Sequence, residues 1–139
     1  MDTRSIGSLT VSAVGLGCNN FGWHLDEAAS REVLFAALDA GITHFDSADV
    51  YGEGESERIL GRALGGRRND VVVVTKFGIE TGGSPANVRR SIEASLDRLG
   101  MDHVDLYYLH RPDPATPIAD TPRAIWRTRP RSAGRSRSG

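Results

Sequence analysis

The chain has 139 residues, of which 39% are hydrophobic and 25% are charged, and its formal net charge is −1. This composition excludes the weakly hydrophobic, highly charged class of disordered proteins and is typical of one folded domain. Because the sequence has no signal-peptide or membrane-span pattern and a single cysteine, Cys18, we expect a cytoplasmic protein without disulfides or membrane association.

Four apolar runs recur along the chain, at residues 11–18, 42–46, 71–77 and 104–110. Their ends lie about 30 residues apart, which is the spacing of repeated strand–helix units. The VVVV that opens the third run does not alternate with polar residues, so this strand should be covered on both faces, as in a parallel sheet flanked by helices. The predicted class is therefore α/β.

The segments between these runs have helical spacing and helical end signals. Asp26 and Ser84 are predicted N-caps, and Pro85 suits the first turn after Ser84. Gly41 and Gly100 suit the position just after a helix. We therefore predict helices within residues 26–41, 55–66 and 84–100. Their expected apolar faces are Val33, Leu34, Ala37 and Leu38; Ile59, Leu60, Ala63 and Leu64; and Val88, Ile92, Leu96 and Leu99.

Two architectures suit this order of elements. One is a doubly wound sheet, since the glycine-rich turn GLGCNNFG follows the first run, but its glycines do not have the spacing of the dinucleotide-binding fingerprint. The other is a (β/α)8 barrel, in which active-site residues come from the C-terminal ends of several strands. Three strand ends carry Asp46, Lys76 and His110. This favours the barrel, of which four strand–helix units would form half.

The residues at these strand ends predict a proton donor. Lys76 is the only lysine of the chain, and Tyr51 follows Asp46 by a short loop that can return its phenol over the same mouth. A phenol is too weak an acid for neutral pH unless a cation lies beside it. Lys76 can be that cation, and Asp46 supplies the counter-charge that keeps it an ammonium. His110 can then donate a hydrogen bond to a substrate oxygen.

The segments GITHFDSADVYGEGESERILGRAL, VVVVTKFG and DLYYLHRPDP closely resemble the aldo-keto reductase family. The resemblance runs from about residue 9 to about residue 120, and it is nearer to the bacterial, ion-channel-β-like branch than to the mammalian aldose reductase branch. It implies an NADPH-dependent (β/α)8-barrel enzyme that reduces small aldehydes or ketones. In that case Asp46, Tyr51, Lys76 and His110 are the catalytic residues, with Tyr51 as general acid and hydride delivered from the nicotinamide.

The first strand-end turn resembles the family's segment near the nicotinamide, which implies Gly17, Cys18, Asn19 and Asp46 as cofactor-binding residues. No metal is expected, because His44 and Asp46 form an H-x-D pair without further ligands at suitable spacing. Cys18 is also open to a purely structural interpretation, as a buried thiol. Three acidic residues, Glu53, Glu55 and Glu57, are interpreted as a solvated helix start.

The last 18 residues differ from the rest of the chain. Residues 122–139 carry six arginines and no acid, with Pro122 where a further helix would begin. We interpret 1–121 as a partial aldo-keto reductase barrel and 122–139 as a disordered basic tail, a possible product of a frameshift. The alternative is a tail that binds nucleic acid or an anionic membrane, but it has no aromatic platform or basic helix face, so neither partner is expected.

The shortness of the chain bears on its expected activity. A full barrel needs about 250 residues, and the family's residues that hold the rest of the cofactor follow the fifth strand. We therefore expect reductase chemistry by family, and a truncated chain that does not turn over unless two copies pair as a barrel-like homodimer. Two further hypotheses are an aldolase in which Lys76 forms a Schiff base and a non-catalytic fragment or regulatory subunit that binds NADPH or a partner.

Overall fold

The computed structural model describes residues 1–121. The predictions for residues 122–139, a disordered tail and a frameshift, lie outside this described part. The described elements, in chain order, are β1 (Thr3–Ile6), β2 (Leu9–Ser12), β3 (Leu16–Gly17), α1 (Glu27–Asp39), β4 (His44–Asp46), the 3-10 helix η1 (Tyr51–Gly54), α2 (Glu55–Leu64), the 3-10 helix η2 (Gly65–Asp70), β5 (Val72–Phe77), α3 (Pro85–Leu99) and β6 (Leu106–Leu109).

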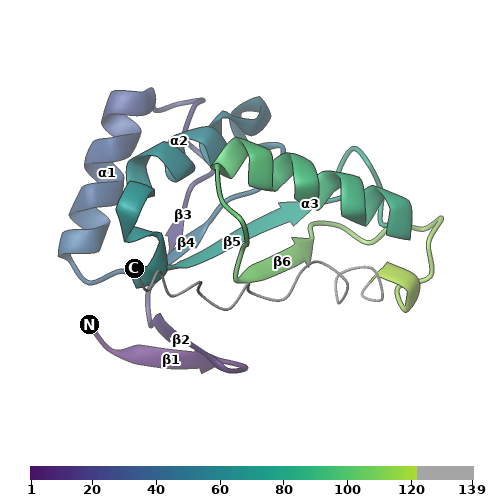
Figure 1. Ribbon diagram of the computed structural model, residues 1–139, viewed down its shortest axis with the longest axis horizontal. Helices are drawn as coiled ribbons and strands as arrows, with labels where there is room; N and C mark the ends of the chain where they lie inside the picture. The colour runs from purple at the N-terminus through teal and green to yellow at the C-terminus, as the bar shows by residue number, and fades with distance from the viewer. Residues whose placement is uncertain (122–139) are drawn as a thin grey trace, which may run out of the picture.

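The main sheet has four parallel strands in the order β3-β4-β5-β6. The three α-helices lie on one side of it, and the antiparallel hairpin β1–β2 lies on the other (Figure 1). Because consecutive strands are neighbours and all run the same way, their C-terminal ends meet at one edge. The strands end at Gly17, Asp46, Phe77 and Leu109, within one residue of the predicted ends.

Strand β5 is buried on both faces, as its uninterrupted valines predict. Val73 packs into the core beneath the helices, whereas Val72 and Val74 pack against the hairpin around Val11. Side chains of a strand alternate between faces, so Lys76 shares the hairpin side with Val72 and Val74. The covering of this second face by a hairpin differs from the predicted flanking helices.

The hairpin is the main element that the sequence reasoning missed. Residues 11–18 were expected to form one strand, but the structure divides them between β2 and β3. A two-residue turn, Gly7-Ser8, joins β1 to β2, and Gly7 has a φ of 58°, which suits a glycine at the first turn position. Gly-Ser between two short strands is a hairpin signal, so the sequence did contain it.

The helix end signals are confirmed. Asp26 accepts a hydrogen bond from the backbone of Ala29 at the start of α1, and Ser84 caps α3 in the same way ahead of Pro85. Gly100 ends α3 in the left-handed conformation. The predicted face of α1 is partly wrong, because Val33 is exposed: with Leu34 and Ala37 turned to the core, Val33 lies at the edge of the stripe.

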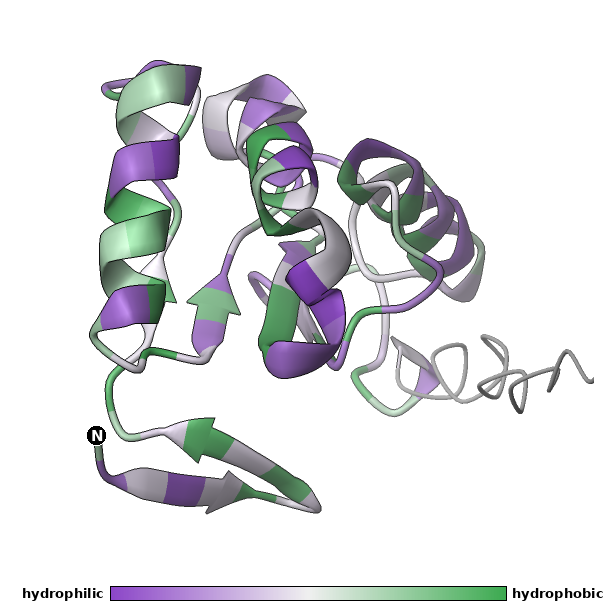
Figure 2. Cartoon of the chain, turned by 60° about the vertical axis from the view of Figure 1, so that its left-hand side comes forward, coloured by the Kyte–Doolittle hydropathy of each residue, from purple (hydrophilic) through white to green (hydrophobic). Residues whose placement is uncertain are grey.

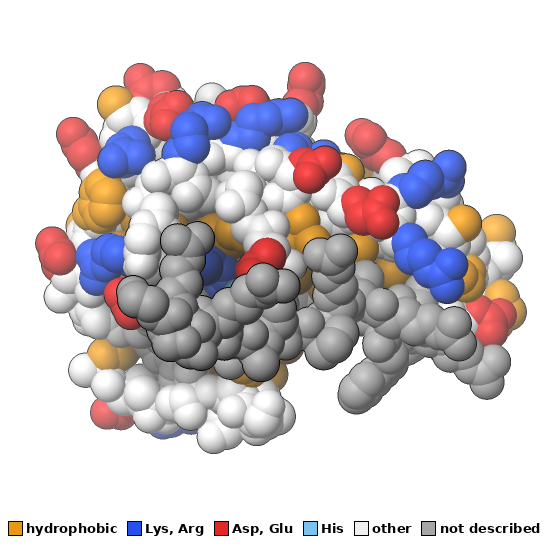
Figure 3. Space-filling model, viewed as in Figure 1, with side chains coloured by type: hydrophobic (Ala, Val, Ile, Leu, Met, Phe, Trp, Pro, Cys, Tyr) orange, Lys and Arg blue, Asp and Glu red, His pale blue; other side chains and the backbone are white. Residues whose placement is uncertain are grey.

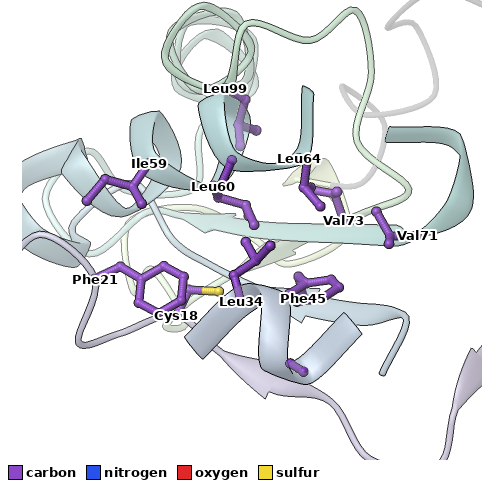
Figure 4. Packing of buried hydrophobic residues seen from close by; sticks show 12 residues of the cluster. Cys18, Phe21, Leu34, Phe45, Ile59, Leu60, Leu64, Val71, Val73 and Leu99 are labelled. Atoms are coloured by element: carbon purple, nitrogen blue, oxygen red, sulfur yellow. The ribbon is translucent and has the colours of Figure 1, made fainter. Parts of the chain in front are cut away.

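The largest core cluster joins the helices to the sheet. Leu34 of α1, Leu60 of α2 and Leu99 of α3 meet Phe45 and Val73 of the strands (Figure 4). Hydrophobic residues recur along these helices (Figure 2), while acidic and basic side chains are interspersed over the side shown in Figure 3. No helix of the described region is long and apolar enough to cross a membrane.

Glu57 is not at a solvated helix start, which corrects the prediction for this residue. Its side chain is fully buried and joins three elements: Thr75 of β5 donates to one carboxylate oxygen at 2.6 Å, and Arg98 of α3 donates to the other at 2.6 Å. A buried carboxylate is stable only when it is paired and hydrogen-bonded. Glu57 therefore links α2, β5 and α3 behind the strand end that carries Lys76.

We predict that Glu57→Gln lowers the free energy of unfolding by about 2–4 kcal/mol, because it leaves the Arg98 guanidinium without its counter-charge. The estimate is at the lower end for a buried pair, since the Arg98 side chain is 20% exposed. Urea denaturation measures the change. The matched control is Glu55→Gln on the same turn, whose half-exposed ion pairs with Arg58 and Arg62 should contribute under about 1 kcal/mol. Equal losses in the two variants would contradict the prediction.

Candidate active site

The Lys76 ammonium lies at the centre of the polar side chains at the strand ends. It donates to Asp46 Oδ1 at 2.6 Å, to the backbone carbonyl of Ser47 at 2.8 Å and to the Tyr51 hydroxyl at 3.4 Å. Its side chain is only 15% exposed. Lysine has three N–H donors, and each has one of these acceptors. The structure thus brings Asp46, Tyr51 and Lys76 together from separate parts of the chain.

Tyr51 is held over the strand ends by an unusual loop. Gly52, Glu53 and Gly54 follow it in succession with φ of 56°, 55° and 90°, a conformation that glycine adopts at little cost and other residues rarely adopt. The loop also packs tightly, because a Cβ on Gly52 would lie 2.8 Å from the carbonyl of Phe21. The left-handed turn therefore lets the chain reverse at once into α2 and leaves the phenol beside Lys76.

His110 completes the group from the end of β6. Its backbone N–H donates to Phe77 at 2.7 Å, and its ring meets the Tyr51 ring edge-to-face with centroids 5.8 Å apart. Burial, followed by the nearby cations of Lys76 and Arg111, lowers the pKa of His110. The imidazole is therefore neutral near pH 7. Its Nδ1 is buried and has no hydrogen-bond partner among the described residues.

The loop after His110 is tied to the loop after β5. Asp113 accepts from the backbone N–H of Gly83 at 2.8 Å, and Thr121 donates to the carbonyl of the same glycine at 2.9 Å. Hydrogen bonds from Gly83, Thr116 and Ala115 lower the pKa of the Asp113 carboxyl. This clamp fixes the chain that leaves His110 against the segment that follows Lys76.

Of the predicted cofactor residues, Gly17 and Asn19 are exposed at the end of β3. Cys18 is different: its side chain is fully buried, and Figure 4 shows its sulfur beside Phe21 and Leu34. Burial and then the Asp46 charge raise the pKa of the thiol to about 12, which makes it unreactive. The backbone N–H and carbonyl of Cys18 are already bonded, to Asp46 and to Ser56. We therefore leave Cys18 out of the proposed cofactor contacts.

The sequence reasoning also missed a layer of hydroxyl groups behind the site. Ser47 and Ser56 are both fully buried, and their hydroxyl oxygens lie 2.8 Å apart. The only sequence signal was that Ser47 directly follows Asp46. Among residues 1–121 no three His, Cys, Asp or Glu side chains are grouped so that they could hold a metal ion, and the His44 ring lies against Gly15.

Asp49 lies on the other side of the same strand-end turn. Its backbone N–H donates to the carbonyl of Lys76 at 3.1 Å, while its Oδ1 is buried and has no hydrogen-bond partner in the described structure. Burial, followed by the neighbouring Glu57 charge, raises the pKa of Asp49 to about 6. The turn that leads from Asp46 to Tyr51 therefore contains a carboxyl that titrates near neutral pH.

The strand ends thus bring together a phenol, a cation beside it, a carboxylate that neutralises the cation and a neutral imidazole at the ring edge, a set of groups that is chemically able to donate a proton. The chain also matches the family model described as Aldo/keto reductase family over residues 13–128. The chain belongs to the aldo/keto reductase family.

Curated relatives agree with this assignment. The chain is 42% identical over 132 residues to aldo-keto reductase yakc [NADP(+)] of Schizosaccharomyces pombe, a match that covers 84% of this chain and 38% of that protein. It is 40% identical over 137 residues to a probable voltage-gated potassium channel subunit beta of Oryza sativa subsp. japonica, covering 90% and 42%. The chain thus spans about two fifths of the length of these relatives.

The fold is similar to those of solved structures. The aldo-keto reductase AKR11C1 from Bacillus halodurans, in its holo form, superposes with a TM-score of 0.81 at 35% identity, covering 91% of this chain and 45% of that one. The resemblance to aldo/keto reductases and channel β subunits is confirmed, and so is the prediction of half a (β/α)8 barrel.

We predict that Asp49 makes stability fall as pH rises. The carboxyl titrates at 3.8 when unfolded and at about 6 when folded, so between these values the folded chain binds the proton that the unfolded chain has released. Urea denaturation at pH 4, 5, 6 and 7 should show this loss, reduced by solvent screening because Asp49 is half-buried. Asp49→Asn should flatten the profile over this window, whereas the exposed control Asp70→Asn should not. An unchanged slope in Asp49→Asn would refute the assignment.

Proposed function

We propose that this chain carries the proton-donor half of an NADPH-dependent site that reduces small aldehydes or ketones to alcohols. The observation that carries the proposal is the Lys76 ammonium placed between Asp46 at 2.6 Å and the Tyr51 hydroxyl at 3.4 Å. An oxygen that gains negative charge as its carbonyl is reduced needs a nearby proton, and a phenol next to a cation can supply one. Residues 1–121 are proposed to form a single domain, the partial aldo-keto reductase barrel.

Each residue has a distinct role in this proposal. Tyr51 is the general acid that gives its proton to the substrate oxygen, and Lys76 stabilises the phenolate that remains. Asp46 neutralises the charge of Lys76 and holds its ammonium in place. His110, neutral because its pKa is lowered, donates a hydrogen bond that orients the carbonyl beside the phenol.

The residues described fit one end of the cofactor. Exposed Gly17 and Asn19 and the partly exposed carboxylate of Asp46 lie at the same edge as Tyr51, and they would hold the nicotinamide. When bound, NADPH supplies the hydride that the carbonyl carbon accepts. Cytoplasmic location is part of the proposal, because the one cysteine is unpaired and NADPH chemistry suits a reducing compartment.

A second candidate is a regulatory subunit that binds NADPH or a partner without turnover. It is favoured by the likeness to proteins named as potassium channel β subunits. Quenching of intrinsic fluorescence by NADPH, without NADPH consumption when carbonyls are added, would support this candidate over the reductase.

We predict that, where two copies of the full chain pair as the barrel-like homodimer and turn over, Tyr51→Phe lowers carbonyl-dependent NADPH oxidation at least about 100-fold, the usual contribution of a general acid. The rate is followed at the absorbance of NADPH with a panel of aldehydes and ketones. Ser30→Ala is the matched control, since Ser30 is a buried α1 residue whose hydroxyl donates to Leu25 away from the strand ends. Turnover that persists in Tyr51→Phe would remove the proton-donor role.

We predict that Lys76 resists reductive trapping by an aldehyde. The N–H groups of the Lys76 ammonium are all engaged with acceptors, and an ammonium has no lone pair with which to form a Schiff base. The chain is treated with an aldehyde and borohydride and then analysed by mass spectrometry. Because Lys76 is the only lysine, the N-terminal amine serves as the internal positive control. Modification of Lys76 as fast as that of the N-terminus would support the aldolase hypothesis instead.

A further inference from the structure

The Lys76 ammonium is held in part by a backbone carbonyl, whose position depends on the segments that surround it. One of its three acceptors is the carbonyl of Ser47, at 2.8 Å. A carboxylate on a side chain can follow a shifting lysine, but a carbonyl stays in place only if its peptide is fixed. What fixes Ser47 therefore decides where the third donor of Lys76 points.

Ser47 is anchored through Ser56 of α2. The Ser56 hydroxyl donates to the carbonyl of Cys18 at 2.8 Å, and the two serine hydroxyls lie 2.8 Å apart. A hydroxyl has one proton, and Ser56 gives its proton to Cys18. The Ser47 hydroxyl must then be the donor to Ser56, so the direction of the whole chain of bonds is set.

This chain of hydrogen bonds closes on the site. The backbone N–H of Cys18 donates to the carbonyl of Asp46 at 2.8 Å, and the backbone N–H of Ser47 donates to Val74 at 2.9 Å. Ser56, Ser47 and Cys18 are all fully buried. Water cannot easily replace a lost partner in such a place, so removal of the Ser56 hydroxyl leaves the Ser47 hydroxyl without its acceptor.

The next residue of α2 keeps this anchor in place. Glu57, adjacent to Ser56, is bonded to Thr75 and Arg98, so the first turn of α2 is fixed to both β5 and α3. The Ser56 hydroxyl cannot follow a movement of β4 without breaking these bonds. It is thus a rigid reference point for the end of β4.

We propose that Ser56 is a positioning residue of the reductase site: through the Ser47 hydroxyl it fixes the carbonyl that accepts from Lys76, and so it holds the ammonium beside Tyr51. The hydrogen bonds of the Ser56 side chain go to Ser47 and Cys18 and not to Lys76 or Tyr51. The proposal rests on the proposed function, but the hydrogen bonding of the Lys76 ammonium can be measured without cofactor or substrate.

The sole lysine provides the measurement. When the full 139-residue chain is grown with [13C,15N]lysine, its spectrum contains one lysine side chain, that of Lys76. The exchange of the ammonium protons with water reports how well its acceptors hold it. We expect Ser56→Ala to speed this exchange on the order of fivefold, the effect of one lost hydrogen bond, and to shift the Lys76 signal.

Four variants separate positioning from general loss of structure. Ser30→Ala, the equally buried helix serine, should leave the Lys76 signal unchanged. Ser47→Ala removes the hydroxyl but keeps the carbonyl, and it should reproduce the effect of Ser56→Ala. The double variant should add nothing further, because both residues act through one bond. Ser56→Thr keeps a hydroxyl and should restore slow exchange.

An unchanged Lys76 signal in folded Ser56→Ala would overturn the proposal, as would an equal change in Ser30→Ala. If Ser56→Ala does not fold, the unchanged signal of Ser47→Ala would overturn it in the same way. A changed Lys76 signal together with full turnover in Tyr51→Phe would instead uphold the positioning role and refute the proposed reaction.

Discussion

The structure at the strand ends depends on one constraint: a lysine ammonium with little access to water must find an acceptor for each of its protons. Desolvation of an unpaired cation would cost several kcal/mol. Lys76 meets this requirement with a carboxylate, a backbone carbonyl and a phenol. The phenol is the weakest of the three acceptors and lies farthest from the ammonium, at 3.4 Å.

A second polar layer lies behind the site and links the segments that carry it. Buried hydroxyls and one buried carboxylate tie the first turn of α2 to the ends of β3, β4 and β5 and to α3. Apolar side chains would fill this space with less risk, since each polar group there must be fully bonded. What polar groups add is direction: a hydrogen bond fixes both the distance and the angle between two segments. This layer therefore orients the strand ends, while the apolar core beneath holds them together.

The sequence predicted those parts of the fold and site whose sequence pattern has a single structural explanation. The strand ends followed from spacing, and Lys76 was conspicuous because no other lysine occurs. Glu57 was misplaced because its charge was given more weight than its position. It precedes Leu60 and Leu64 by one and two helical turns, on the same stripe, and periodicity alone would have placed it inside. The role of the Ser47 carbonyl had no sequence signal, since any residue has a carbonyl.

Access of water to the strand ends controls the strength of the electrostatic interaction between Lys76 and Asp46. Asp46 is 38% exposed although its partner is 15% exposed, so water reaches the carboxylate side of the pair and screens it. Tyr108 of β6 is in register with Lys76 of β5, and its side chain is exposed like that of Asp46. The positions of Asp46, Tyr51 and Lys76 are thus set within residues 1–121, whereas the exposure of Asp46 to water limits the strength of their electrostatic coupling.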